Sequence, residues 1–499
     1  MTDSSLIATV KAALPLIPEI VAHSSTVPPP IEDIYLAKGH EKALNLEATL
    51  VVGDRGSGKS FWSAALNGEQ TRKLIGQQFP RLRLDQCTVS WGYAAERGHP
   101  DYPSRQVLEQ LVARGSNAEW IWRTVILHQL LPKIGEQLPM ESWQERVEFV
   151  ANNVEKEEAW LTAINAALRT SGERHLIVFD ALDRLGNDWS TIRSLVKGLL
   201  RVCLDARFLS NIHTKLFMRP DMWEDQSIWA FPDASKLQHN RVVLEWTRVD
   251  LYGLLWHWLA NHPSDADNGF RNWCRSHHNH DFVKLSNSSQ SIWLVPASLE
   301  SNEEKQAEVL SAIASPYMGT NSRRGKTYTW LPTHLADARG RVTPRSFLLA
   351  IKHAQQESES GNYSEPLHYE GIKKGVAHAS RVRLQELKED YFWIDEVIGA
   401  LKGLTVPTSA EELIQRWRDS QAIEKIEARV AQDNTDESTF LPPHTLESRQ
   451  TQVQKEEALI AALIEIGVMS RLPDNRLNIP DLFRVAAGIK RRGGVKAVR

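Results

Sequence analysis

The 499-residue chain has few cysteines, no long apolar run and almost no net charge. Cys87, Cys203 and Cys274 lie far apart in the sequence, which excludes a dense disulfide framework and suits a reducing compartment. No apolar run approaches the roughly 20 residues of a membrane-spanning helix, and no signal-peptide pattern opens the chain. The net charge of −3 excludes nucleic-acid binding through overall positive charge. We therefore expect a soluble cytoplasmic protein without membrane contact, in which any contact with nucleic acid is local.

What the chain does have is an alternating pattern of short apolar runs and amphipathic segments up to about residue 260. The predicted strands cover 48–52, 86–91, 175–179, 214–218 and 241–244. The predicted helices cover 61–66, 119–131, 141–170, 190–204 and 249–259. Strands that alternate with helices in this way are typical of an α/β fold with a parallel sheet.

The pattern changes after residue 260. Residues 261–330 look irregular and polar, and helices are predicted over 343–356 and 372–393. A polar, proline-containing segment from Gln432 to Gln450 indicates a linker. The residues after this segment suggest a helix, two short strands around a turn and a final helix, which is the pattern of a small winged-helix-like module.

A glycine-rich segment with the sequence Gly-Asp-Arg-Gly-Ser-Gly-Lys-Ser lies between the first predicted strand and the first predicted helix. Glycines there permit positive φ angles, so successive backbone N–H groups can point at phosphates, and the following helix adds its positive dipole end. A strand, this eight-residue pattern and a helix together define a P-loop, and a chance glycine-rich turn is the alternative. The predicted ATP-binding residues are Gly53, Asp54, Arg55, Gly56, Ser57, Gly58, Lys59, Ser60 and Phe61.

Two aspartates follow the apolar run 175–179. Asp180, at the end of that predicted strand, can hold Mg²⁺ through water, and with Ser60 it forms the predicted magnesium site. Asp183 is the candidate for the group that positions the attacking water, although a helix N-cap is an equally open role. Ala181 stands where many ATPases carry a glutamate, so the catalytic base is uncertain at this point. Lys59, which can reach the β- and γ-phosphates, completes this catalytic group.

Two arginines are further candidates. Arg219 follows the predicted strand 214–218, where a guanidinium could sense the γ-phosphate, and a surface pair with Asp221 or Asp225 is the alternative. Arg345 follows Thr343 and Pro344 at the start of a predicted helix, and either nucleotide contact or a plain surface position fits it. A short basic stretch at 323–326 is interpreted as a solvated loop.

Taken together, these segments resemble the STAND and AAA+ branches of the P-loop ATPases. The Asp-x-Leu-Asp form at 180–183 is similar to the STAND switch ATPases, and the Pro-Arg pair at 344–345 is similar to the second sensor of AAA+ and origin-recognition proteins. The layout also resembles bacterial P-loop ATPases of phage-defence operons. The resemblance implies a slow ATP- and Mg²⁺-dependent switch ATPase that self-associates or controls a separate effector protein.

The resemblance covers residues 35–355 and extends weakly to the C-terminal module. An alternative is a DNA-engaging ATPase that uses this module, which the basic C-terminal end favours and the acidic first helix of the module opposes. The predicted divisions are an N-terminal extension (1–34), a P-loop ATPase core (35–260), an irregular insert (261–342), a helical subdomain (343–430), a linker (431–454) and a winged-helix-like module (455–499).

Overall fold

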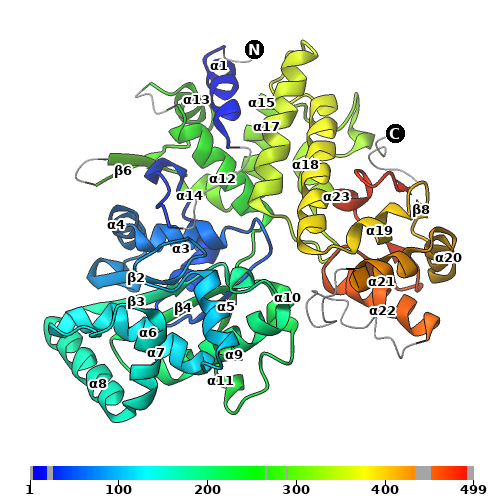
Figure 1. The fold of residues 1–499 in the computed structure, drawn as a ribbon. Helices are drawn as coiled ribbons and strands as arrows, with labels where there is room; N and C mark the ends of the chain where they lie inside the picture. The colour runs from blue at the N-terminus through cyan, green and yellow to red at the C-terminus, as the bar shows by residue number, and fades with distance from the viewer. Residues whose placement is uncertain (1–3, 19–25, 264–266, 288–289, 433–450, 492–499) are drawn as a thin grey trace. The chain divides into compact units, whose positions relative to one another are not determined.

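The computed structural model (Figure 1) describes residues 4–18, 26–263, 267–287, 290–432 and 451–491. The chain forms two compact units. The sheet unit comprises Ala22–Glu245, and the helical unit comprises Met1–Val21 together with Trp246–Arg499. No helix of the described residues is both long and apolar enough to cross a membrane.

The sheet unit contains five parallel strands in the order β2-β3-β4-β1-β5. The strands are β1 (Leu50–Val52), β2 (Cys87–Tyr93), β3 (Arg174–Phe179), β4 (Ile212–Met218) and β5 (Arg241–Val243). The helices are α2 (Glu41–Leu44), α3 (Lys59–Asn67), α4 (Glu69–Gln78), α5 (Arg105–Ala113), α6 (Ala118–Leu130), α7 (Trp143–Asn152), α8 (Val154–Ser171), α9 (Trp189–Ala206), α10 (Pro220–Glu224) and α11 (Ala234–Gln238). The α/β class predicted from the sequence is confirmed.

Helices cover both faces of this sheet. Figure 1 shows α3 and α4 on one side and α6, α7 and α8 on the other. Residues 175–179 of β3 and all of β4 are buried, which is why both strands read as nearly continuous apolar runs. The single helix predicted over 141–170 is instead two helices, because the backbone of Asn153 leaves the helical region between α7 and α8.

The helical unit is built around one continuous apolar core. Its helices are α1 (Ser4–Ala13), α12 (Arg248–Asn261), α13 (Gly269–His278), α14 (Ala297–Glu300), α15 (Glu303–Ile313), α16 (Thr327–Leu335), α17 (Pro344–Ser360), α18 (Tyr369–Asp390), α19 (Ile394–Gly399), α20 (Ala410–Ser420), α21 (Ala422–Gln432), α22 (Gln452–Glu465) and α23 (Asp481–Arg484). Its strands are β6 (Val283–Asn287), β7 (Gln290–Leu294), β8 (Thr405–Val406), β9 (Ser470–Arg471), β10 (Leu477–Asn478) and β11 (Lys490–Arg491).

Residues 261–342 are not the irregular insert that we predicted. They contain α13, the β6–β7 hairpin, α14, α15 and α16. In α13 the apolar stripe is narrow, with Phe270, Trp273 and Cys274 buried between polar neighbours, so the polar residues dominate the local sequence. The boundary at residue 260 also moves, because α12 is buried on nearly all sides within the helical unit and the division falls at Glu245.

The N-terminal residues are not a separate extension either. Leu6 and Val10 of α1 are fully buried in the core of the helical unit. Trp258 Nε1 donates to Ala13 O at 2.9 Å, and Lys352 Nζ donates to Ile17 O at 2.7 Å. Residues 4–17 are therefore an integral part of the helical unit.

The C-terminal module begins before residue 455. β11 pairs in parallel with β8, and Thr408 exchanges two backbone hydrogen bonds with Leu477 of β10, at 3.0 and 2.7 Å. The first strand of the predicted pair lies at 470–471, and the final predicted helix is only α23. The predicted division between 343–430 and 455–499 thus cuts through one shared core. Most of the predicted linker, 433–450, lies outside the described residues, as does the end of the basic C-terminus.

Candidate nucleotide-binding site

The glycine-rich loop adopts the strand–loop–helix arrangement that its sequence predicts. β1 ends at Val52, the N–H of Gly53 donates to Met218 O at 3.1 Å, and α3 begins at Lys59. Gly56 and Gly58 have φ angles of 83° and 104°, which side chains disfavour. A Cβ atom on Gly53 would lie 2.4 Å from Ser57 Oγ. The loop thus forms a tight backbone cradle at the N-terminus of α3, the arrangement that binds phosphate groups.

Lys59 closes this cradle. Its Nζ donates to Gly53 O at 2.6 Å and to Asp54 O at 3.0 Å. Burial lowers the pKa of Lys59, and the nearby carboxylate of Asp180 partly opposes that shift. The ammonium is therefore held at the loop by two carbonyl oxygens, within reach of any phosphate that the loop binds.

Asp180 is brought to the loop from another strand. It directly follows β3, and its N–H donates to Tyr93 O at 2.9 Å. β4 separates β3 from β1, yet Ser63 of α3 donates to Asp180 Oδ2 at 3.1 Å, which places the carboxylate beside the helix that follows the loop. Burial raises the pKa of Asp180, and a hydrogen bond from the Ser60 side chain opposes that shift. The structure thus brings together Ser60 and Asp180, the predicted magnesium ligands.

Asp183 and Arg219, two further predicted catalytic residues, lie at the same end of the parallel strands as Asp180. β4 neighbours β3, as the interpretation of Arg219 requires. Arg219 Nη1 lies 3.4 Å from Asp183 Oδ2, and its Nε and Nη2 contact the two carboxylate oxygens of Asp221 at 3.1 and 3.0 Å. Arg219 is therefore held by two aspartates, one of them the partner proposed in the surface-pair alternative. Asp183 does not cap the following helix, because the N-cap of α9 is Asp188, which accepts from Thr191 N at 2.8 Å.

Phe61 and Arg345, which were also predicted to contact ATP, are engaged by other side chains in this structure. Phe61 packs edge-on against Trp62, with ring centroids 5.4 Å apart. Arg345 belongs to the helical unit, where Thr343 caps α17 as predicted. Arg345 Nη1 there forms an ion pair with Glu386 Oε1 at 2.6 Å. The role of Arg345 in nucleotide binding stays a prediction.

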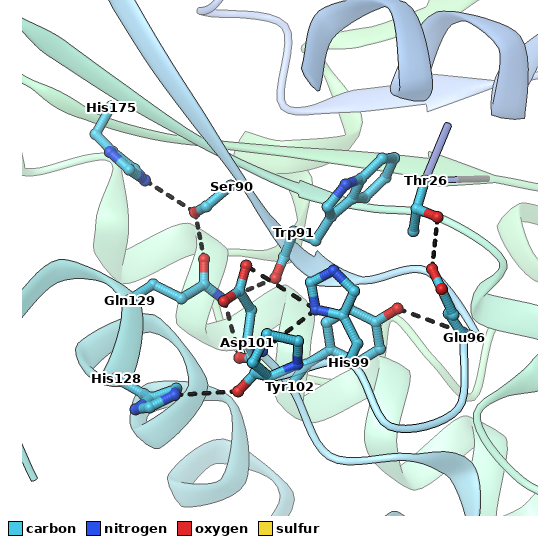
Figure 2. Close-up of polar contacts among 11 residues, drawn as sticks. Thr26, Ser90, Trp91, Glu96, His99, Asp101, Tyr102, His128, Gln129 and His175 are labelled. Atoms are coloured by element: carbon cyan, nitrogen blue, oxygen red, sulfur yellow. Dashed lines mark hydrogen bonds and ion pairs between the residues drawn. The ribbon is translucent and has the colours of Figure 1, made fainter. Parts of the chain in front are cut away.

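The sequence did not indicate a partly buried polar network that crosses β2, β3 and α6 (Figure 2). The Gln129 amide nitrogen donates to two backbone carbonyls, of Trp91 and Asp101. Its Oε1 therefore faces Ser90 and accepts a hydrogen bond from the Ser90 hydroxyl. His175 lies 2.9 Å from the same Ser90 oxygen. Ser90 and His175 are 85 residues apart, so no local pattern reveals the pair.

In this network Ser90 donates to Gln129 and not to His175, so the pair is not arranged like the serine and histidine of a nucleophilic site. The Ser90 hydroxyl donates its hydrogen bond to Gln129, so the Ser90 oxygen accepts one from His175 Nε2. His175 Nδ1 then accepts a hydrogen bond from Thr88 Oγ1 at 2.8 Å. Burial lowers the pKa of His175 to about 3, so the ring is neutral, as this arrangement requires. The network is a structural anchor for the loop that follows β2, where His99 and Tyr102 stack with centroids 4.5 Å apart (Figure 2).

The fold and the loop define a parallel α/β protein with a P-loop-type site. No protein-family model and no curated protein matches the chain. Among solved structures, it is similar to the ORC2 protein of Aeropyrum pernix in ADPNP and ADP complexes, at 12% identity and a TM-score of 0.39 over 93% of each chain. It is also similar to Cdc6p of Pyrobaculum aerophilum (11%, TM-score 0.32, 93% of this chain and 94% of that one) and to the Aeropyrum pernix ORC1 protein in complex with DNA (12%, TM-score 0.32, 94% and 92%). At these values the similarity does not establish a shared function, and the function is inferred from the geometry of the site instead.

Proposed function

We propose that this chain binds ATP with Mg²⁺ at residues 53–60 and hydrolyses it slowly, as a regulatory switch ATPase. The observation that supports this best is the position of Asp180. The buried carboxylate of Asp180, directly after β3, lies beside the adjacent residues Lys59 and Ser60 although it comes from a distant part of the sequence. A glycine-rich turn formed by chance would not gather a cation, a hydroxyl and a carboxylate at one helix N-terminus.

The residues of the loop fit this cofactor. A side chain at position 53 would collide with Ser57, so the loop can be this tight only with glycine there. The N-terminus of α3 adds its positive dipole end to the loop. Ser60 and Asp180 supply the hard oxygen ligands that Mg²⁺ prefers. When bound, Mg²⁺ neutralises charge on the phosphates. Lys59 adds a positive charge that stabilises the same oxygens during transfer.

We propose slow turnover because the residue after Asp180 is an alanine, which cannot serve as a catalytic base. Ala181 has a φ angle of 54°, in the left-handed region, and its methyl group cannot accept a proton. Asp183 is then the carboxylate positioned to orient a water, since it lies at the same end of the strands and is paired with Arg219. Because that ion pair engages an oxygen of the Asp183 carboxylate, Arg219 competes with a water for the same group, which favours a slow ATPase over a fast one.

The biological role is a separate proposal. Self-association, a separate effector protein and a place in bacterial phage defence come from the resemblance to STAND ATPases alone. A second candidate is a DNA-engaging ATPase that uses the β9–β10 hairpin, on which Arg471 is exposed. Against it, Arg484 is buried and contacts Asp481 at 2.7 Å, and Arg491 contacts the same carboxylate at 3.3 Å, so part of the predicted basic end is neutralised internally.

Phosphate release from ATP tests the ATPase proposal. We expect Mg²⁺-dependent turnover by the wild-type chain and a loss of roughly 10²-fold or more in Asp180→Asn. Asp188→Asn is a matched control, because it also removes one carboxylate from the sheet unit while asparagine keeps the cap of α9. Wild-type turnover in Asp180→Asn would contradict the proposed site. Stimulation by DNA that weakens with salt would favour the second candidate.

A further inference from the structure

A basic loop joins α15 to α16 in the helical unit. We use this name for residues 319–326, which have the sequence Gly-Thr-Asn-Ser-Arg-Arg-Gly-Lys. Arg323, Arg324 and Lys326 are all exposed or partly exposed. None of the three forms an ion pair with a carboxylate in the part of the chain that the structure describes, and the sequence has no aspartate or glutamate between Glu308 and Asp337. The loop therefore presents three positive charges without local compensation.

The base of the basic loop is firmly held. Met318 N donates to Gly325 O at 3.0 Å, and Thr327 N donates to Pro316 O at 3.0 Å. The buried Thr327 hydroxyl donates to Ser315 O at 2.5 Å. At the tip, Asn321 Oδ1 accepts from Arg323 N at 3.1 Å, which forms the 3₁₀ turn Ser322–Arg324. Because its backbone is already ordered, the loop loses little conformational entropy when it binds a partner.

An aromatic side chain lies next to these charges. Trp330 is one helical turn after Lys326, the N-cap residue of α16, and its N–H donates to Lys326 O at 2.9 Å. A Cβ atom on Gly325 would be 3.7 Å from Trp330 Cδ1. Trp330 packs partly against the core of the helical unit, and His334 stacks on one face of its ring with centroids 3.7 Å apart, which fixes the ring orientation. The rest of the ring is partly exposed, and only this part can contact a ligand.

We propose that the basic loop and Trp330 form a binding surface for single-stranded nucleic acid. Guanidinium groups match phosphate oxygens in pairs, and the exposed Asn321 and Ser322 add polar groups that can donate to phosphates. An acidic peptide could use the same charges, but only its occasional apolar side chains could pack on the partly exposed indole beside them. A base can stack on an aromatic ring whatever its sequence. Cations beside an aromatic residue therefore favour an unpaired strand over an acidic protein.

The surface does not depend on the ATP site, so its test can fail while the ATPase proposal stands. The measurement is fluorescence anisotropy of labelled dT and rU oligonucleotides with the full chain, without nucleotide and over a series of salt concentrations. The variant Arg323→Gln/Arg324→Gln/Lys326→Gln should weaken binding and reduce the slope of log affinity against log salt by about two, since each single-strand phosphate contact contributes roughly 0.7.

The matched control is Arg81→Gln/Arg114→Gln/Arg169→Gln, which changes the net charge equally at three exposed arginines of the sheet unit. It should bind the oligonucleotides nearly as the wild-type chain does. If the two triple variants lose the same affinity, overall charge explains the binding and the proposal is wrong.

Trp330→Leu separates stacking from charge. We expect its affinity for both oligonucleotides to fall about fivefold or more, with the salt slope unchanged. An affinity equal to that of the wild-type chain would reduce the surface to a general polyanion contact and overturn the single-strand assignment. If poly-glutamate displaces the oligonucleotides as well per negative charge as unlabelled oligonucleotide does, the single-strand assignment is also wrong, and an acidic protein is the better partner. The relative affinities of dT and rU then tell whether DNA or RNA is the preferred strand.

Discussion

Replacing Lys59 with alanine tests the nucleotide site most directly, and the structure sets two separate magnitudes. The first concerns the chain without nucleotide. Lys59 Nζ makes two hydrogen bonds across the loop, each worth about 0.5–1.5 kcal/mol. Burial of the ammonium, which lowers its pKa, offsets part of this gain. We therefore expect Lys59→Ala to lower stability by about 1–2 kcal/mol while the fold stays intact.

The second magnitude concerns binding. At ATP concentrations 100 times the dissociation constant, a single site stabilises the folded state by about 2.7 kcal/mol. If Lys59→Ala weakens binding about 100-fold, the same concentration adds only about 0.4 kcal/mol. For a unit of this size 1 kcal/mol corresponds to about 2–4 °C in Tm. The expected ATP-induced shift is therefore about 5–10 °C for the wild-type chain and about 1 °C for the variant.

Thermal unfolding with and without ATP and Mg²⁺ measures both quantities, followed through the transition of the sheet unit. Lys73→Ala is the matched control, because Lys73 is exposed on α4 in the same unit and pairs with Glu69 one turn away. It should show the full ATP-induced shift and no change without nucleotide. A wild-type shift in Lys59→Ala would refute the assignment of the loop as the phosphate site.

Four other variants test the same structure. Asp183→Asn should keep ATP affinity and slow phosphate release if Asp183 orients water, and unchanged turnover would assign it only to the pair with Arg219. Arg219→Ala should bind ADP normally and discriminate ATP poorly in calorimetry, whereas an equal loss of both affinities would indicate a structural arginine. His175 has a folded pKa of about 3, below the unfolded value near 6.5, so its contribution to stability is complete above pH 6.5 and is lost as the pH falls. In urea titrations His175→Gln should therefore lose about 2 kcal/mol less than the wild-type chain between pH 7 and pH 5. Deleting residues 455–499 should destabilise the helical unit, since β8 loses β11, while a deletion that changes only salt-sensitive DNA binding would contradict the shared core.

The sequence predicted the sheet unit well because its signals are local. The apolar runs of β3 and β4 are continuous, and the P-loop pattern fixes a strand before it and a helix after it, so Asp180 could be placed at the site from position alone. Contacts between distant segments were not predictable. Two examples are the hydrogen bonds from Ser63 to Asp180 and from Ser90 to Gln129. Both result from the packing of helices on the sheet, which leaves no regular spacing in the sequence.

The helical unit was predicted less well, for a related reason. Its core collects single buried residues from many short elements, as Leu6 of α1 and Ile489 near the C-terminus show. A short helix with a narrow apolar stripe, such as α13, looks polar when its sequence is considered alone. The division placed at residue 455 was wrong because β8 and β11 are too short to be recognised as strands until they are seen paired.

The position of α1 has a consequence for how the chain can fold during synthesis. Its apolar face is completed by helices that are made after the whole sheet unit, and Lys352, which binds Ile17 O, lies 335 residues further along the chain. Until those helices emerge, Leu6 and Val10 lack their native partners in α12, α13 and α15, while the sheet unit already holds all five of its strands. Vectorial synthesis therefore favours a chain in which the sheet unit folds first and α1 docks last. A nascent chain arrested once residue 245 has emerged from the ribosome should protect the P-loop from proteases and leave residues 4–17 open to cleavage.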